Sequence, residues 1–205
     1  EFNNLLSTFK GKMIANTKGA FKEKVLYNET LHVYGTGGIH SKDKPGVIVP
    51  EDDEVLIDAD VSSYYPSALV LLEACPKHLD KDIFIPIYNN IVEKRIKAKK
   101  EGNDFIKNSF KLVLNGTYGN LISEYSWLYD PLQAMKITVN NQLFLTMLSE
   151  KLSDNGFKIE SINTDGITVR IKKINLDKFY RICHNWERYT GFELEYAEYL
   201  KVVRR

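Results

Sequence analysis

Cysteine and net charge are both scarce in this 205-residue sequence. Its two cysteines, Cys75 and Cys183, lie far apart and belong to no Cys-x-x-Cys or Cys/His pattern. The sequence therefore indicates neither a zinc site nor a disulfide framework, and we expect a reducing interior, the cytoplasm, as its location. The formal net charge is only +1, so binding of a polyanion would depend on local basic clusters rather than on the overall balance.

Long apolar runs are also missing. The longest, such as ALVLL at 68–72, fall well short of the roughly 20 residues that a membrane span needs, and no signal peptide is visible. Hydrophobic residues make up 43% of the chain, which is enough for the core of one large domain or two small ones. The first residue is Glu1 rather than methionine, which favours an excised part of a longer protein.

The pattern of apolar residues predicts helices and strands in a mixed order. A β-strand is predicted at 55–61, followed by a helix at 66–74 that starts with Pro66 in its first turn. The remaining predicted elements are helices at 87–100, 105–121 and 131–156, a β-hairpin of residues 157–163 and 166–171, a helix at 175–190 and a strand at 192–205. This order predicts an α+β fold in which an antiparallel sheet packs on helices and residues 87–121 form a two-helix hairpin.

Two aspartates stand where predicted strands end. Asp60 follows the apolar strand at 55–59, and Asp165 lies at the tip of the predicted β-hairpin. Taken singly, each can be an ordinary turn aspartate. If the sheet sets the strand beside the hairpin, however, both carboxylates come to one edge, where oxygen ligands suit Mg²⁺ better than zinc. Two such ions about 3.5–4 Å apart are the usual device for in-line phosphoryl transfer.

The predicted two-helix hairpin is basic. Positive side chains outnumber negative ones between positions 93 and 111: Lys94, Arg95, Lys97, Lys99, Lys100, Lys107 and Lys111 against Glu93, Glu101 and Asp104. This can be a solvated helix face. Alternatively, Lys107 and Lys111 lie on one helical face that Asn115 and Tyr118 extend, and such a stripe could contact a triphosphate at one end and a base at the other.

Three segments resemble the motifs of the family B DNA polymerases. DVSSYYPS at 60–67 resembles their motif A, Asp-x-x-Ser-Leu-Tyr-Pro-Ser, and KLVLNGTYG at 111–119 resembles motif B, Lys-x-x-x-Asn-Ser-x-Tyr-Gly. INTDG at 162–166 occupies the place of motif C, Gly-Asp-Thr-Asp-Ser. In addition, GTGGIHS at 35–41 resembles the Tyr-x-Gly-Gly segment, and residues 129–143 resemble the segment after motif B in phage members. Three motifs in the family's order make this resemblance specific.

The resemblance implies the core of a DNA-directed DNA polymerase of phage type. Such a core transfers deoxynucleotides to a primer 3′-hydroxyl by a two-metal mechanism, with primer-template DNA and dNTP as partners. Residues 1–56 would form a lead-in segment, 57–86 and 122–205 the two parts of a palm, and 87–121 the fingers. No Asp-x-Glu exonuclease motif occurs in 1–56, and no thumb follows. We therefore expect the exonuclease and thumb parts elsewhere in the parent chain, and weak binding of primer-template by the fragment alone.

The resemblance also assigns catalytic roles. Asp60 and Asp165 would be the catalytic residues and would bind two Mg²⁺ ions, which Mn²⁺ can replace, with the backbone carbonyl of Val61 as a further ligand. The backbone N–H groups of Ser63 and Tyr64 would face the phosphates of the nucleotide, as helix starts favour anions.

The remaining assignments concern the nucleotide and the DNA. Tyr65 would lie under the sugar and exclude ribose. Arg95 and Lys111 would contact the triphosphate, and Asn115 and Tyr118 would line the pocket for the nascent base pair. Contacts with DNA are expected from Gly37, Gly38 and Thr164. Thr138 and Gln142, on the helix at 131–156, are further candidates for DNA contact, although Phe144, Leu145 and Leu148 make that helix mainly a packing element.

The sequence departs from the family pattern at four positions. Asn163 stands where motif C usually has its first aspartate, and Gly166 stands where it has a serine. Gly116 replaces the serine of motif B, and Tyr64 replaces the leucine of motif A. These changes leave two alternatives open: a non-catalytic nucleic-acid-binding relic of the same fold, or another two-metal phosphotransferase such as a nuclease.

Overall fold

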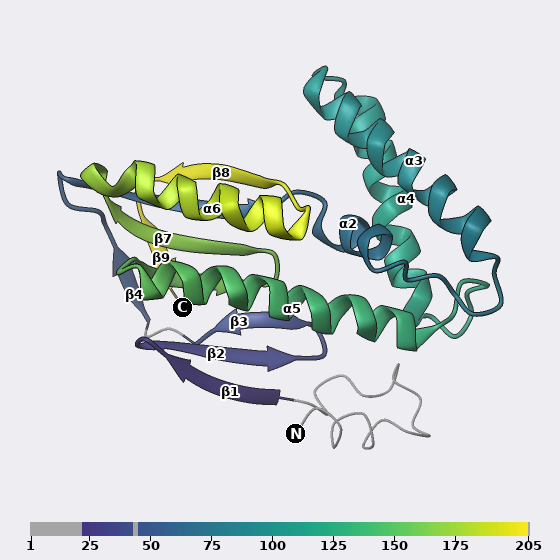
Figure 1. Cartoon of the computed structure of the whole chain (residues 1–205), viewed down its shortest axis with the longest axis horizontal. Coiled ribbons are helices and arrows are strands. Elements are labelled where there is room, and N and C mark those ends of the chain that lie inside the picture. The colour runs from purple at the N-terminus through teal and green to yellow at the C-terminus, as the bar shows by residue number, and fades with distance from the viewer. Residues whose placement is uncertain (1–21, 43–44, 205) are drawn as a thin grey trace. The chain divides into compact units, whose positions relative to one another are not determined.

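The computed structural model of the protein describes residues 22–42 and 45–204 (Figure 1). Of the predicted lead-in segment at 1–56, residues 1–21 and 43–44 therefore lie outside the described residues. The chain divides into two compact units. Among the described residues, one unit holds 65–139 and the other holds 22–64 together with 140–204.

The unit of residues 22–64 and 140–204 is built on a seven-stranded sheet (Figure 1). The strands follow the spatial order β1-β2-β3-β6-β7-β5-β8, and every neighbouring pair is antiparallel. The strands are β1 (Lys22–Tyr27), β2 (Thr30–Gly35), β3 (Gly38–Ser41), β5 (Glu54–Val61), β6 (Lys158–Asn163), β7 (Gly166–Lys172) and β8 (Leu194–Tyr199). A separate two-stranded ribbon pairs β4 (Gly46–Ile48) with β9 (Val202–Arg204).

Strand β5 shows which face of this sheet forms the core with the helices. Its residues Val55, Ile57, Ala59 and Val61 are buried and alternate with positions that face the other way, which is the period of a strand with one face in a core. Tyr196 of β8 stands opposite Ala59, and its ring packs edge-on against those of α6. The apolar face of β5 is therefore the helix side, and half-buried Asp58 and Asp60 belong to the opposite face, together with buried Leu56.

Two helical segments cover the helix side within this unit (Figure 1). Helix α6 (Leu176–Thr190) buries Phe179, Cys183 and Trp186 and ends at Gly191 in the left-handed conformation. The second is the part of α5 (Pro131–Asp154) from residue 140 onwards. Hydrogen bonds tie α5 to β2 at three successive turns: Gln142 to the N–H of Gly35, Thr146 to Tyr34, and Ser149 to His32.

The other unit is helical. It contains α2 (Tyr64–Leu71) from Tyr65 onwards, α3 (Lys81–Lys100), α4 (Asp104–Ile122) and the first part of α5. Helices α3 and α4 form an antiparallel hairpin through the short turn at 101–103, with Asn103 capping α4. Tyr88 of α3 is buried and donates a hydrogen bond of 3.1 Å to the carbonyl of Leu114 on α4.

The predicted α+β fold, with an antiparallel sheet packed on helices and a two-helix hairpin, is confirmed. Helix α3, however, starts at Lys81 rather than at residue 87, because Asp80 accepts a hydrogen bond from the N–H of Asp82 and caps the helix. The helix therefore includes Pro86, which lies between the helices predicted at 66–74 and 87–100. The predicted strand at 192–205 is two strands, β8 and β9, that belong to different sheets.

No helix in the described part of the chain is long and apolar enough to cross a membrane.

Candidate active site

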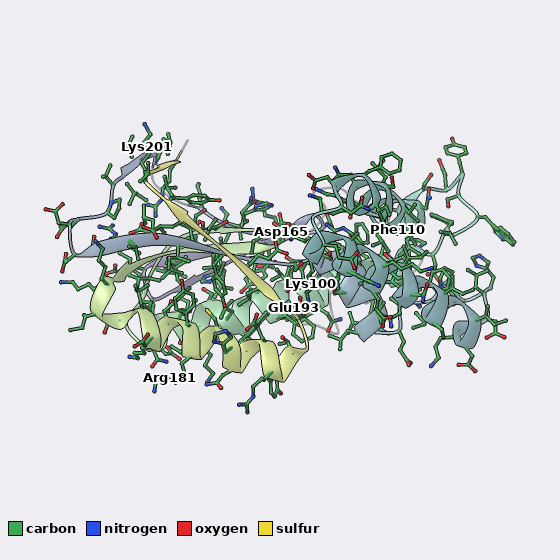
Figure 2. All side chains as sticks on the ribbon, turned by 90° about the horizontal axis from the view of Figure 1, so that it is seen from above. Lys100, Phe110, Asp165, Arg181, Glu193 and Lys201 are labelled. Atoms are coloured by element: carbon green, nitrogen blue, oxygen red, sulfur yellow. The ribbon has the colours of Figure 1, made fainter. Side chains whose placement is uncertain are left out.

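Asp60 and Asp165 come together at the same edge of the sheet. Asp60 pairs with Gly166 across β5 and β7, so its strand neighbour is the residue that follows Asp165. The N–H of Val61 donates a 2.8 Å hydrogen bond to the carbonyl of Asp165. The two-residue turn between β6 and β7 carries Asp165, which is labelled in Figure 2. The backbone thus fixes the two aspartates on adjacent strands.

Gly166 leaves room for the carboxylate of Asp60. A Cβ atom at position 166 would lie 3.0 Å from Oδ1 of Asp60 and 3.5 Å from the carbonyl oxygen of Ala59. The carboxylate of Asp60 therefore leans over the start of β7, toward the turn that carries Asp165. A serine at position 166 would have to share this space.

Two further acidic residues, which were not predicted from the sequence, lie on the strands next to Asp60 or on its own strand. Asp58 precedes Asp60 by two positions on β5 and accepts hydrogen bonds from Oγ1 of Thr168 at 2.7 Å and from the hydroxyl of Tyr199 at 3.2 Å. Glu195 of β8 stands directly opposite Asp60. The signal for Asp58 was present in the Asp-Ala-Asp spacing at 58–60, since alternate strand residues share a face. Glu195 had no such signal, because strand pairing cannot be read from spacing.

Asp165 is half-buried, and its surroundings disfavour its charged form. Burial raises the pKa of its carboxyl above the ordinary value; the charge of Asp58 adds to this rise, while a backbone hydrogen bond and His40 oppose it. A nearby divalent cation would reverse this preference by favouring the carboxylate.

The start of α2 follows Asp60 closely. Ser63 has a φ of 52°, and the N–H of Ser62 donates to the carbonyl of Glu193, so the chain turns sharply before Tyr64 begins the helix. The side chain of Tyr64 is buried: its hydroxyl donates a 2.5 Å hydrogen bond to the carbonyl of Asn141, and its ring packs edge-on against Phe192. The tyrosine at this position, where the motif has leucine, thus serves packing.

In the helical unit, Tyr65 and Tyr118 form a pair. Their ring centroids are 4.5 Å apart at an angle of 58°, and both side chains are half-buried. The hydroxyl of Tyr118 lies 2.6 Å from Oγ1 of Thr138, and burial raises the pKa of Tyr118. Thr138 and Gln142 are 1% and 3% exposed, so the prediction that they contact DNA is wrong: both side chains pack inside the protein.

The basic positions of the hairpin differ in exposure. Lys111 and Asn115 are exposed on α4, one turn apart, and Arg95 of α3 is half-buried. Lys107, which shares the helical face of Lys111, forms an ion pair with Asp104 at the start of α4. Lys100, labelled in Figure 2, is exposed at the end of α3. A triphosphate could thus be met by Lys111 on α4 and by Arg95 on α3.

The residues present suit a magnesium ion. In the described part of the chain, no group of three or more His, Cys, Asp or Glu side chains is arranged to hold a metal. Mg²⁺ is commonly held by one or two carboxylates together with waters and substrate phosphates, rather than by an all-protein cage. The carboxylates of Asp60 and Asp165, with the carbonyl of Val61 as a third oxygen, fit that mode.

The fold, an antiparallel sheet with a two-helix hairpin between its strands in sequence, resembles that of a solved structure. The chain is similar to the family B DNA polymerase from the hyperthermophilic archaeon Pyrobaculum calidifontis, with a TM-score of 0.59 and 19% sequence identity. The likeness covers 78% of this chain and 25% of that one, so the chain spans about a quarter of the length of the polymerase it matches. This similarity shows a common fold. No protein-family model and no curated protein matches the sequence.

Proposed function

We propose that the chain is the palm-and-fingers part of a DNA-directed DNA polymerase and adds deoxynucleotides to a primer 3′-hydroxyl under the direction of a template. The observation that carries this proposal is the backbone contact of the two aspartates: Asp60 pairs with Gly166, the residue after Asp165, and the N–H of Val61 donates to the carbonyl of Asp165. The motif order in the sequence and the likeness in fold support it.

The two aspartates would hold two Mg²⁺ ions, or Mn²⁺ in their place, together with the carbonyl of Val61. When bound, the ions lower the pKa of the primer hydroxyl and stabilise charge on the transferring phosphate. The protein orients its ligands through the main chain, because the hydrogen bond from Val61 to Asp165 fixes the turn against β5. Asp58 lies beside the site and is held by Thr168 and Tyr199, so it adds negative charge that attracts cations.

The proposed nucleotide contacts are those that the resemblance assigns, residue by residue. The N–H groups of Ser63 and Tyr64, at the start of α2, would face its phosphates. Lys111 and Arg95 would contact the triphosphate, Arg95 by its forked guanidinium. Tyr65 would pack under the sugar, held by Tyr118, and Asn115 would border the base.

Primer-template DNA is the proposed partner, together with exonuclease and thumb parts of a parent chain. Gly37 is exposed at the turn between β2 and β3, Thr164 is half-buried, and Gly38 is buried against Thr164. The resemblance assigns all three to the template, and we propose that Gly37 and Thr164 border it directly. Phosphate contacts supply most nucleic-acid affinity, so the fragment alone would hold DNA weakly. The resemblance of residues 129–143 to phage members suggests a phage enzyme acting in the cytoplasm of its host.

Primer extension tests the proposal. The 205-residue chain and the full-length gene product that contains it are supplied with a labelled primer-template, dNTP and Mg²⁺. We expect incorporation that needs both template and metal, and its loss in Asp60→Asn and in Asp165→Asn. Undiminished extension by either variant, or none by the full-length product, would refute the proposal.

A non-catalytic DNA-binding relic is the second candidate, because Asn163 gives the turn an amide where motif C has a carboxylate. The same assay separates the two functions: a relic binds primer-template in full-length form without dNTP turnover. A nuclease is separated as well, since its product shortens the primer and needs no dNTP.

A further inference from the structure

Strand β3 is attached to the turn that carries Asp165. The N–H of Thr164 donates a 2.8 Å hydrogen bond to the carbonyl of Ile39, and His40 pairs with Asn163 in the register of β3 and β6. The Nδ1 of His40 lies 3.1 Å from Oδ1 of Asn163. The three residues before Asp165 are thus bound by consecutive residues of β3, since Oγ of Ser41 also accepts a 2.8 Å hydrogen bond from the N–H of Ile162.

The turn itself has a conformation that needs such support. Thr164 has a φ of 35°, which is uncommon for a β-branched residue, and the N–H of Asp165 points at the carbonyl of Asn163 in a very tight turn. Strained backbone of this kind persists only where the surroundings determine it. Here β3 supports the turn on one side, and the hydrogen bond from Val61 supports it on the other.

Gly38 lies directly against the side chain of Thr164. It has a φ of 132°, and a Cβ atom at this position would lie 2.9 Å from Cγ2 and 3.3 Å from Oγ1 of Thr164. Real Cβ atoms essentially never approach another carbon so closely, so a side chain at position 38 would require the side chain of Thr164, the neighbour of Asp165, to shift. Gly37, one residue earlier, has nothing within 4 Å of the corresponding point.

We propose that Gly38 and Thr164 form a positioning pair that sets the place of the Asp165 carboxylate beside Asp60. This proposal rests on the proposed function and assigns Gly38 a role beyond the DNA contact expected from the sequence. The pair acts by shape: the missing side chain of Gly38 admits the methyl group of Thr164, and the hydrogen bond from Thr164 to Ile39 keeps it there. The metal site then depends on a strand that carries no proposed metal ligand.

The test uses Gly38→Ala, with Gly156→Ala as its matched control. Gly156, at the end of α5, also has a positive φ, 84°, but a Cβ there meets nothing within 4 Å. Both variants therefore carry the backbone strain of an L-residue at a glycine position, and only Gly38→Ala also displaces Thr164. Two quantities are measured in full-length protein: the shift in Tm caused by Mg²⁺ relative to EDTA, and kcat and KM for dNTP in primer extension.

We expect Gly38→Ala to lose most of the Mg²⁺-induced Tm shift and about 10- to 100-fold in kcat, with KM for dNTP nearly unchanged. Gly156→Ala should lower the Tm in EDTA yet keep both the Mg²⁺ shift and kcat. Adding Thr164→Ser, which removes the methyl group that clashes, should restore part of the loss in Gly38→Ala.

The outcomes separate this inference from the proposed function. If the unaltered protein shows neither a Mg²⁺ shift nor incorporation, the proposed function fails. If it shows both and Gly38→Ala retains them, or if Thr164→Ser restores nothing, the positioning pair is refuted while the polymerase stands.

Discussion

The main-chain N–H of Val61 and the main-chain carbonyl of Asp165 are joined by a 2.8 Å hydrogen bond. This bond links the residue after Asp60 to the turn between β6 and β7, so backbone hydrogen bonds hold the chain segments that carry both candidate ligands. Changes that alter only the charge of these carboxylates should therefore leave the scaffold in place.

Asp165→Asn should abolish incorporation and, in EDTA at neutral pH, should not destabilise the fold. Because the pKa of Asp165 is raised in the folded chain, its favourable contribution is present below its ordinary pKa of 3.8 and is lost as the pH rises through the folded value. At pH 7 the ionised carboxylate therefore costs stability, and a neutral amide removes that cost. Thermal unfolding from pH 4 to 8 measures this as an equal or higher Tm for the variant at the neutral end.

The same experiment repeated with Mg²⁺ gives the complementary result. Mg²⁺ should raise the Tm of the unaltered chain and leave that of Asp165→Asn unchanged, because the ion is proposed to bind this carboxylate and a ligand that binds only the folded state stabilises it. Asp53→Asn, on an exposed loop, serves as the control and should behave as the unaltered chain does. If Asp165→Asn is less stable than the unaltered chain at every pH in EDTA, the assignment of an electrostatic cost to the ionised Asp165 is wrong.

Lys111→Ala should raise KM for dNTP by about 10- to 100-fold, because a charge-assisted hydrogen bond to a phosphate contributes about 1.5–3 kcal/mol. The side chain is exposed on α4, so the Tm should stay unchanged. Steady-state extension at varied dNTP measures the effect. Lys151→Ala, an exposed lysine at the end of α5, is the control, and equal KM values for the two variants would exclude Lys111 from the nucleotide site.

The sequence predicted the parts of the fold that depend on local pattern. The apolar alternation of 55–61 defined β5, and the two apolar runs around Thr164 and Asp165 defined the β6–β7 hairpin. Pairing of distant segments could not be obtained in this way. Strands β1 to β3 were not predicted, because all residues of β1 but the last are exposed and β3 is only four residues long. Their place in the sheet depends on the pairing of β3 with β6 and on the hydrogen bonds of β2 with α5.

In the candidate site, too, only the residues with a local sequence signal were predicted. Asp60 and Asp165 stand at strand ends, and that local signal identified them. Glu195 was not identified, because its position opposite Asp60 results from the register of β5 and β8, which no spacing in the sequence reveals. For Thr138 the sequence left both DNA contact and packing open, and only the packed structure shows that its side chain is buried beside Tyr118.

Thr138→Val should weaken discrimination between deoxynucleotides and ribonucleotides. Valine keeps the shape of threonine and removes the hydroxyl 2.6 Å from that of Tyr118, and an unpaired buried hydroxyl costs about 1–3 kcal/mol. Tyr118 packs on Tyr65 at 4.5 Å, so a loosened Tyr118 loosens the ring proposed to exclude ribose. The ratio of kcat/KM for dNTP to that for rNTP should fall several-fold.

Tyr118→Phe tests whether this effect passes through the hydrogen bond. The double variant Thr138→Val/Tyr118→Phe should cost less than the sum of the single changes, because both single changes break the same contact. A lower Tm with an unchanged ratio of dNTP to rNTP would show that the pair serves packing alone.

His32→Gln should reduce the loss of stability at acidic pH. Burial lowers the pKa of His32 below its ordinary 6.5, against backbone hydrogen bonds and the charge of Glu150 that raise it. The unfolded chain then binds a proton at higher pH than the folded chain, so this contribution is complete above about pH 6.5 and is lost as the pH falls. Urea unfolding at pH 7.5 and 5.5 should show a smaller decrease for the variant, whereas His184→Gln, at an exposed site, should match the unaltered chain. Equal decreases for all three would contradict the role of His32.

Glu160→Gln should destabilise the unit of residues 22–64 and 140–204 by about 3–5 kcal/mol, since it removes one partner from a buried ionic cluster. The Glu160 side chain is 1% exposed at an irregularity in β6 and binds Nε of Arg170 at 2.7 Å and Nη2 of Arg204 at 2.5 Å. Arg204 lies on β9, so the cluster joins the small ribbon to the main sheet. A loss of that size is a large share of the total for a typical domain, and denaturant unfolding would resolve it. Glu198→Gln, at an exposed position on β8, is the control. If Glu160→Gln lowers the free energy of unfolding no more than this control does, the two arginines find other partners when Glu160 loses its charge.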